Sequence, residues 1–533
     1  MLVARIVTAG SRLFPGSLVP PAVPSFFAPR LQRATLYIPP LAYSRFATAL
    51  LVYPGLAQLT SLVLLPPPLP LLPVALLALV QLLPFAIVSF MASKRRHGVE
   101  AELPFVAMLL YVLSHESFPG LREAFNRIGS LGRDVFPAFT TESQVLDRNL
   151  TYSTGPEMST IEETFDAHPS VVFREFLHGY LRTLASGIDL HDYLRVESER
   201  LTSLLEERWR TYSVMVSSVT EIAFIFLAVF PIGMQMIAGA LLSGSSSDLL
   251  LESVLLLTGV TTAIVLWLDY AQPALHDGGY PLSAVALVCA CLGGFLGLYF
   301  VHFFGPVEAA LSSLAVSSAF VAYSRSFFRD LRSGEREIVW MLHDLAEGAR
   351  SGTSLPAVLS RLRDNPARYP SLGSSISSFV MALSLGKSPR QAQRGVRHPS
   401  WLVRVSFGLL AVSFETGSGY EQLDRLSLSF RRMWDAKRSI QSSVLPFAVL
   451  GAAVPVISVA SYWFLSNMQG LSLLVPGLSA SGGSISIMTS VLASSVLTGF
   501  IVSKAYSFSF RSFVGIPPIL VAALVSFIFF GFV

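Results

Sequence analysis

The sequence has few of the residues and motifs on which disulfide-bonded proteins and enzymes depend. Only two of its 533 residues are cysteine, and Cys289 and Cys291 lie two positions apart in an apolar run, which argues against both a disulfide and a metal site. No HExxH motif is present, no GxSxG precedes a helix, and the nine histidines lack metal-ligand spacing. We therefore predict no catalytic residue, no cofactor and no metal.

Charged residues are also scarce. Only 14% of the chain is charged, whereas 52% is hydrophobic and 38 residues are phenylalanine. An average soluble domain carries about 25% charged residues. The composition excludes an ordinary soluble protein and indicates that much of the chain faces lipid.

Long apolar runs are abundant instead. A helix that crosses a membrane needs about 20 mainly apolar residues. Segments that meet or approach this length lie at approximately 46–65, 69–92, 213–242, 249–268, 282–304, 306–323, 444–466, 484–503 and 513–533. Pro54 interrupts the first of them, and the short linker at 66–68 favours a hairpin with the second. The pattern predicts an all-α, polytopic membrane protein with about nine transmembrane helices.

The distribution of basic residues predicts the topology. Lys and Arg remain on the cytosolic side of a membrane more often than they are translocated. With a cytosolic N terminus, all 38 of them fall on the cytosolic side. The organisation we predict is a basic arm (1–45), a transmembrane hairpin (46–92), a cytosolic helical domain (93–212), four spans (213–323), a second, basic cytosolic domain (324–442) and three spans (443–533). The chain is therefore expected in the cell membrane, with its C terminus outside.

The two polar stretches share one pattern. In the later stretch, Gly352 is expected to end a helix in a left-handed conformation and Ser354 to cap the next. The earlier stretch repeats this helix, break and return helix, and each stretch then has a Gly turn and a long helix with a Trp (Trp209, Trp434) before it enters the membrane. The turn residues are Ser351, Gly352, Ser354 and Leu355 in the later copy, Ser117 and Gly120 in the earlier one, and Gly187, Gly417 and Gly419 at the Gly turns. These parallels indicate an internal duplication.

This duplicated pattern resembles the type II secretion system F family, the inner-membrane platforms of type II secretion, type IV pili and the archaellum. The resemblance covers both polar stretches and the helices that leave them. Nine spans favour the archaeal type, because bacterial members commonly have about three. The resemblance implies two homologous cytosolic helical bundles without catalytic residues, a hexameric cytosolic secretion ATPase as a partner, and prepilin-like or archaellin-like subunits assembled into a filament.

Several alternatives remain open at this stage. The filament could serve motility, adhesion or DNA uptake, and the platform could rotate or be displaced. A homodimer would match a hexameric motor in symmetry. Membrane lipids are expected partners, and nucleic acid is not an expected partner. The rival function is a secondary membrane transporter, whose repeats would lie within the membrane rather than in polar domains.

Charge differs between the two polar stretches. The first has 13 basic and 18 acidic residues and the second 18 basic and 10 acidic. An acidic partner would therefore be steered toward the second stretch. The cations that we predict to dock the ATPase are Arg350, Arg361, Arg363, Lys387, Arg390, Arg394, Arg397, Arg431, Arg432, Lys437 and Arg438. Binding of anionic lipid is the alternative for those just before a span, from Arg431 to Arg438.

One segment, Gly386-Lys387-Ser388, ends as a phosphate-binding loop does. Such a loop needs another glycine five residues earlier, because bare backbone N–H groups must close around the phosphates. Met381 stands there instead. We therefore interpret the segment as a loop followed by the start of a helix, and expect any ATP hydrolysis to belong to a partner.

Overall fold

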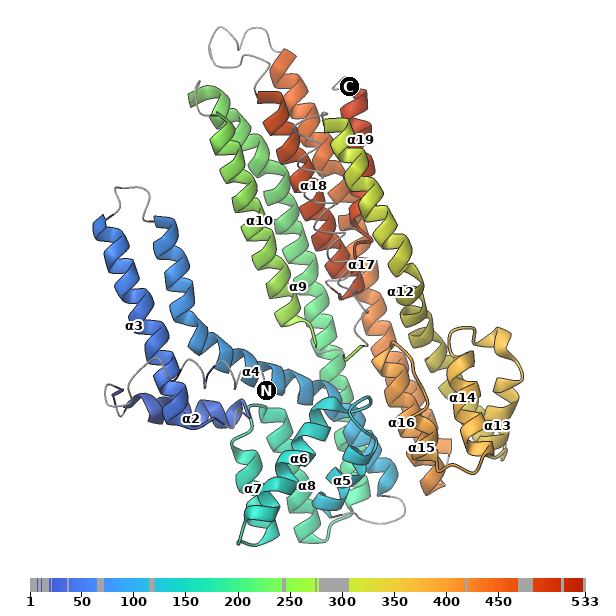
Figure 1. The fold of residues 1–533 in the computed structure, drawn as a ribbon. Coiled ribbons are helices and arrows are strands. Elements are labelled where there is room, and N and C mark those ends of the chain that lie inside the picture. Colours follow the sequence, from blue (N-terminus) through green and yellow to red (C-terminus); the bar gives the residue numbers. More distant parts are fainter. Residues whose placement is uncertain are drawn as a thin grey trace. The chain divides into compact units, whose positions relative to one another are not determined.

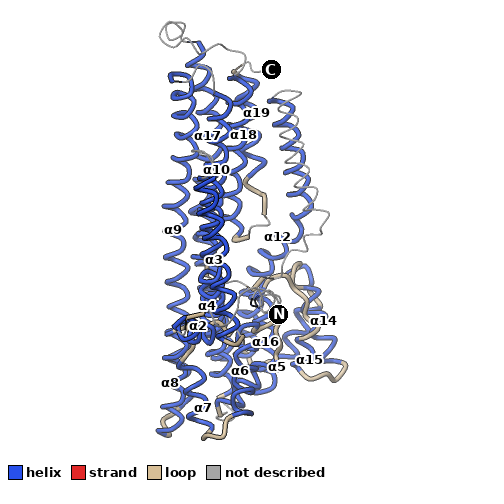
Figure 2. The backbone as a smooth tube through the Cα atoms, turned by 60° about the vertical axis from the view of Figure 1, so that its left-hand side comes forward, coloured by secondary structure: helices blue, strands red, loops and turns tan. Residues whose placement is uncertain are grey.

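The computed structural model describes the chain as helices joined by short loops. The residues that it describes are 7, 11, 19–20, 22–35, 38–64, 71–114, 120–241, 246–273, 276–277, 306–417, 420–467, 483–509 and 512–530. They form seventeen α-helices and one turn of 3-10 helix, with no strand among them (Figures 1 and 2). The predicted all-α fold is confirmed. Two compact units divide the chain, Met1–Leu201 and Thr202–Val533.

The first unit begins with three helices that pack together. Helix α2 (Ala22–Arg33) lies against α3 (Pro40–Leu64) and α4 (Leu71–Leu113), which form a pair. Phe27, Tyr43 and Val88 belong to their shared apolar core. The predicted hairpin is therefore present as a helix pair. Its linker at 66–68 lies outside the described residues, and its membrane crossing remains a prediction.

The polar part of the first unit is built around the C-terminal half of α4. Helices α5 (Leu121–Ser130), α6 (Pro137–Tyr152), α7 (Glu157–Asp166) and α8 (Val171–Ser186) follow it. Both α6 and α8 pack on α4, and α5 and α7 pack on α6. Every residue from 98 to 114 is buried, so this part of α4 is enclosed on all sides.

The second polar domain repeats this plan. Its elements are α12 (Pro306–Arg350), α13 (Leu355–Arg363), the 3-10 turn η3 (Pro366–Arg368), α14 (Gly373–Ser384), α15 (Pro389–Gln393), α16 (Trp401–Thr416) and α17 (Tyr420–Asn467). Helix α16 packs on α12, in the position that α8 takes on α4. The central helix of each domain is therefore the one that enters it from an apolar segment.

Glycines in the left-handed region end the principal helices of both domains. Gly352, Gly187 and Gly417 have φ angles of +77°, +68° and +62°. After α12, the Thr353 N–H donates to the Gly348 carbonyl at 3.0 Å, which pairs a carbonyl that the helix end leaves without a partner. Ser354 occupies the N-cap of α13 without a side-chain capping bond.

The remaining turn residues behave differently or lie outside the description. Gly120 is the N-cap of α5 with a φ of −55°, so it needs no glycine-specific conformation. Ser351 Oγ donates to the Gly348 carbonyl at 2.8 Å, and Leu355 is the first residue of α13. Ser117 and Gly419 are outside the described residues.

The Gly386-Lys387-Ser388 segment joins two helices. Gly386, with a φ of +76°, follows the C-cap of α14, and the Lys387 N–H donates to the Ala382 carbonyl at 3.1 Å. The Ser388 side chain accepts a hydrogen bond from the Gln391 N–H and so caps α15. The glycine ends one helix and the serine begins the next, in agreement with the interpretation of this segment as a loop followed by the start of a helix.

Apolar helices form the rest of the second unit. Helices α18 (Gly483–Ser507) and α19 (Ile516–Phe529) pack with α12 and α17 around a core that includes Val459, Val491 and Leu520, and α10 (Ser246–Ala271) packs on α18. Large apolar side chains also face outward, Val449 being 70% and Leu266 58% exposed. Outward apolar surface on long helices is what contact with lipid requires.

Three of the described helices are long and apolar enough to cross a membrane. They are Leu190–Pro231 within α9 (Leu190–Leu241), Val307–Arg350 and Tyr420–Ser461. Leu256–Ala271 and Ile516–Phe529 are apolar but shorter. Segment 282–304, with Cys289 and Cys291, is outside the described residues. A membrane location is thus supported, and the count of nine spans remains a prediction.

The two tryptophans do not occupy equivalent positions in the two domains. Trp209 is fully buried and Trp434 is half-buried. Counted from Gly187 and Gly417, they also stand at different distances along their helices. The similarity of the two domains is therefore seen better in their buried glutamate contacts than in these tryptophans.

Candidate functional site

Each polar domain carries two glutamates, separated by a single residue, inside its central helix. Glu100 and Glu102 lie on α4, and Glu335 and Glu337 lie on α12. All four are buried, with exposed fractions of 5%, 0%, 5% and 1% in that order. A buried carboxylate is costly unless hydrogen-bond donors or cations surround it. The partners of these glutamates therefore indicate what the pair does.

The second glutamate of each pair caps a helix that belongs to a distant part of the chain. Glu102 accepts hydrogen bonds from the N–H groups of Ala138 and Phe139, both at 2.8 Å, where α6 begins. Glu337 accepts from the N–H groups of Ser371 and Leu372, at 2.9 and 3.1 Å, where α14 begins.

Neither α6 nor α14 has a capping side chain of its own. A helix N-terminus leaves N–H groups unpaired and attracts negative charge. The glutamate from the central helix supplies both the acceptor and the charge, and so joins the two helices.

The first glutamate of each pair holds a His-Pro-Ser tripeptide. Ser170 Oγ donates to Glu100 at 2.7 Å, and Ser400 Oγ donates to Glu335 at 3.4 Å. Each serine N–H also donates to Nδ1 of the histidine two residues earlier, at 3.1 Å in both copies. His168 and His398 are buried. The same geometry thus recurs in both polar domains.

These contacts also reveal a sequence motif that the two polar domains share and that the turn residues alone do not show. The tripeptides His168-Pro169-Ser170 and His398-Pro399-Ser400 are identical, and each stands at the same distance before its left-handed glycine, Gly187 or Gly417. The Glu-x-Glu pairs stand in matching places on the central helices. Identical short motifs in the same order would have aligned the two domains without a structure.

The two copies differ in the cations that neutralise the cluster. In the first, Arg95 makes a bidentate pair with buried Glu142, at 2.7 and 2.6 Å. Burial raises the pKa of Glu142, but the hydrogen bonds and charges of Arg95 and His168 together outweigh that effect and hold its pKa at about 2. In the second, Lys437 of α17 lies 2.5 Å from Glu335. Each cluster therefore contains a buried ion pair.

The arrangement connects helices that are distant in the sequence. The carboxylates accept hydrogen bonds from helix starts and serines, as described above, while Oε1 of Glu337 is buried without a hydrogen-bond partner. Within the described part of the chain, no group of three His, Cys, Asp or Glu side chains lies close enough to hold a metal ion.

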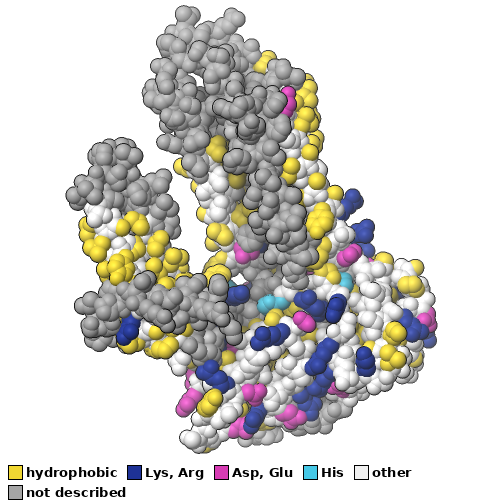
Figure 3. All heavy atoms as spheres, viewed as in Figure 1, with side chains coloured by type: hydrophobic (Ala, Val, Ile, Leu, Met, Phe, Trp, Pro, Cys, Tyr) yellow, Lys and Arg dark blue, Asp and Glu magenta, His cyan; other side chains and the backbone are white. Residues whose placement is uncertain are grey.

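The predicted docking cations fall on three segments rather than one patch. The first comprises Arg350, Arg361 and Arg363 around the α12–α13 turn, the second Lys387, Arg390, Arg394 and Arg397 around α15, and the third Arg431, Arg432, Lys437 and Arg438 on α17. Figure 3 shows dark-blue Lys and Arg side chains around α15 and α16. Arg390 lies 2.6 Å from Glu415. Lys437 is only 4% exposed, because it is paired with Glu335, and it does not belong to this exposed set.

Comparison of the chain with models of protein families, with curated proteins and with solved structures found no match.

Proposed function

We propose that this chain is a non-enzymatic platform protein of a membrane-anchored filament assembly machine of the archaeal pilus or archaellum kind. It would dock a hexameric cytosolic secretion ATPase and pass the movement of that motor to prepilin-like subunits. The observation that carries this proposal is the duplicated polar domain, in which the same buried contacts attach the surrounding helices to a central helix that continues into an apolar segment.

Continuous helices suit this role because they transmit displacement. Helix α17 has 48 residues, and at 1.5 Å per residue it is about 72 Å long. It begins in the second polar domain and ends in the apolar bundle, as α12 does in the reverse direction. A partner that pushes on the polar domain would therefore move these helices as rods.

The buried contacts make the polar domain suitable for receiving force. Glu337 ties the start of α14 to α12, and Glu335 ties the start of α16 to the same helix. Lys437 adds α17 to this cluster through its 2.5 Å contact with Glu335. Movement applied to α14 or α16 would consequently reach both long helices.

Contacts at the ends of α10 and α18 support the proposed orientation. The Trp401 N–H donates to Asp277 at 2.8 Å, and Arg404 donates to the His276 carbonyl at 2.6 Å, so the chain after α10 lies against α16. Lys504, near the end of α18, lies 2.5 Å from Asp269. A cytosolic N terminus and an external C terminus require both helix ends on the side of the polar domain.

Charge reversal on the second polar domain tests the docking. We expect the full-length protein in detergent to bind the secretion ATPase encoded beside it. The double variant Arg394→Glu, Arg397→Glu should bind at least tenfold more weakly at low salt, because both side chains are exposed and basic. The matched control is Arg133→Glu, Arg182→Glu, which reverses two exposed cations of the first domain.

Binding would be measured by co-purification and by titration at two salt concentrations. Failure of the unaltered protein to bind the folded ATPase at low salt would contradict the platform function. Equal weakening by both double variants would instead contradict only the assignment of the contact to the second domain.

A further inference from the structure

Helix α12 carries a line of arginines where its apolar part ends. Arg325, Arg329, Arg332 and Arg336 follow one another at intervals of four, three and four residues. Residues at these intervals share one face of a helix. The line begins directly after the apolar stretch 306–323, so it stands at the boundary between the lipid-facing and polar parts of the helix.

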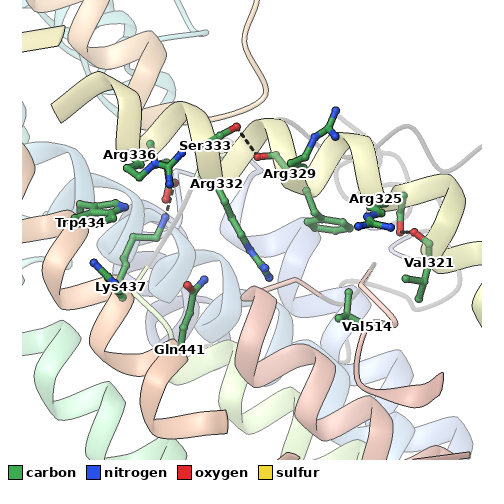
Figure 4. A pocket seen from close by; sticks show the side chains of 14 residues that line it. Val321, Arg325, Arg329, Arg332, Ser333, Arg336, Trp434, Lys437, Gln441 and Val514 are labelled. Atoms are coloured by element: carbon green, nitrogen blue, oxygen red, sulfur yellow. Dashed lines mark hydrogen bonds and ion pairs between the residues drawn. The ribbon is translucent and has the colours of Figure 1, made fainter. Parts of the chain in front are cut away.

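This face of α12 lines a cavity whose opposite wall is α17. The cavity has a volume of about 710 Å³, and Trp434, Lys437, Arg438 and Gln441 contribute the α17 wall. Figure 4 shows the Arg332 side chain leaving α12 and pointing into the space between the two helices. The α17 residues lie just before the apolar stretch 444–466, so both walls meet the membrane boundary together.

Positive charge in the cavity greatly exceeds negative charge. Its lining includes six cationic side chains and one carboxylate, and the carboxylate, Glu335, is already paired with Lys437. Among the described residues, no carboxylate lies within ion-pair distance of Arg325, Arg332, Arg336 or Arg438. Nη2 of Arg332 is buried without a hydrogen-bond partner, although its guanidinium lies over the Tyr506 ring at 4.3 Å.

A buried, unpartnered guanidinium nitrogen in a basic cavity calls for an anion. Guanidinium groups bind the oxygens of phosphate or carboxylate through paired N–H donors, and phosphate is the anion that a membrane surface supplies. The cavity also has apolar lining, from Val321, Phe328 and Val514, which a free inorganic phosphate would not use. Trp434, whose ring lies 5.2 Å from the Arg438 guanidinium, is of the kind enriched at membrane interfaces.

We propose that this cavity binds the phosphate of an anionic phospholipid from the adjacent leaflet. The arginines contact the phosphate, and the apolar lining contacts the glycerol end of the lipid. Basic pockets between helices at the cytosolic side of a membrane are suited to such headgroups. The bound lipid joins α12 to α17, the two helices that lead out of the second polar domain. This inference needs a membrane location but not a role in filament assembly.

The test compares ligands that share the phosphate or the lipid part. The full-length protein in an uncharged detergent would be titrated with dioctanoyl phosphatidylglycerol, dioctanoyl phosphatidylcholine and inorganic phosphate, and binding followed by native mass spectrometry and by the melting temperature. We expect saturable binding and a rise in melting temperature with phosphatidylglycerol, and at least tenfold weaker binding of the other two.

Variants then assign the binding to the cavity. Arg332→Gln with Arg438→Gln should weaken phosphatidylglycerol binding about tenfold, whereas Arg361→Gln with Arg363→Gln, on exposed α13, should not. Should the first variant fail to fold, the exposed pair Arg325→Gln and Arg438→Gln replaces it. The inference would be overturned if phosphatidylcholine or inorganic phosphate bound as tightly as phosphatidylglycerol, or if the cavity variants bound phosphatidylglycerol undiminished. Binding of a polyglutamate peptide but not of phosphatidylglycerol would also overturn it.

Discussion

At the scale of the residue, a few buried carboxylates define the architecture of both polar domains. Glu102 and Glu337 replace the local capping residues that α6 and α14 lack. Capping by a glutamate from another helix explains how the starts of these helices, which have no capping side chain of their own, remain stable. It also makes the stability of each domain depend on a single carboxylate.

Removal of the Glu337 carboxylate should therefore destabilise the second polar domain. In Glu337→Ala, the N–H groups of Ser371 and Leu372 lose their acceptor, at a cost of about 1–3 kcal/mol. Glu337→Gln retains one acceptor oxygen and should lose less. Melting temperatures in detergent would measure both, with exposed Glu347→Ala as control. Equal melting temperatures for the Glu337→Ala variant and the control would contradict the capping role.

Buried His398 should make the same domain sensitive to acid. Burial lowers the pKa of His398 to about 4, with Asp330 and Asp277 opposing that effect and Arg404 adding to it. The folded state favours the neutral ring, so the ring's contribution to the stability of the fold is present above pH 6.5. That contribution is lost as the pH falls toward 4. The loss is about 3 kcal/mol at most. We expect a falling melting temperature over this range and a shallower fall in His398→Gln, and parallel curves would disprove it.

At the scale of the element, left-handed glycines set where helices end. Gly352 has open space around its Cα, so a methyl group there would meet no neighbour. Its φ of +77° is nevertheless unfavourable for other residues. The α12–α13 turn therefore depends on the backbone freedom of glycine and not on space.

Substitution at two glycines separates these effects. Gly352→Ala should cost about 1 kcal/mol, because alanine resists the left-handed conformation. Gly259→Ala, within α10 and also without neighbours, should have the opposite sign, because alanine favours a helix interior. Melting temperatures that shift in the same direction for both variants would show that backbone conformation is not the cause.

At the scale of the whole molecule, long helices connect polar and apolar regions. Helices α12 and α17 each carry both kinds of surface, and the basic cavity lies where these surfaces change. Their side-by-side packing explains how a phosphate in that cavity would influence the polar domain beyond it. The proposed docking and lipid sites thus lie on one mechanical unit of the chain.

Local patterns in the sequence determined the fold class and much of the element layout. Apolar runs specified long helices, and Gly352, Gly187 and Gly417 marked helix ends, because these features depend on neighbouring residues alone. The repeated pattern of helix, break and return helix in the two polar stretches was also visible. Individual spans were less certain, since apolar composition alone does not separate a membrane helix from a buried one such as residues 98–114.

Only the tertiary structure decided which distant residues meet. Glu100 contacts Ser170, and Glu335 contacts both Ser400 and Lys437. These contacts depend on how the helices pack rather than on local spacing. The same packing removes Lys437 from the exposed cations and turns the arginines of α12 into the wall of a cavity. Charge along a chain shows that a cation is present, whereas its partner and its exposure are set by helices brought together from elsewhere.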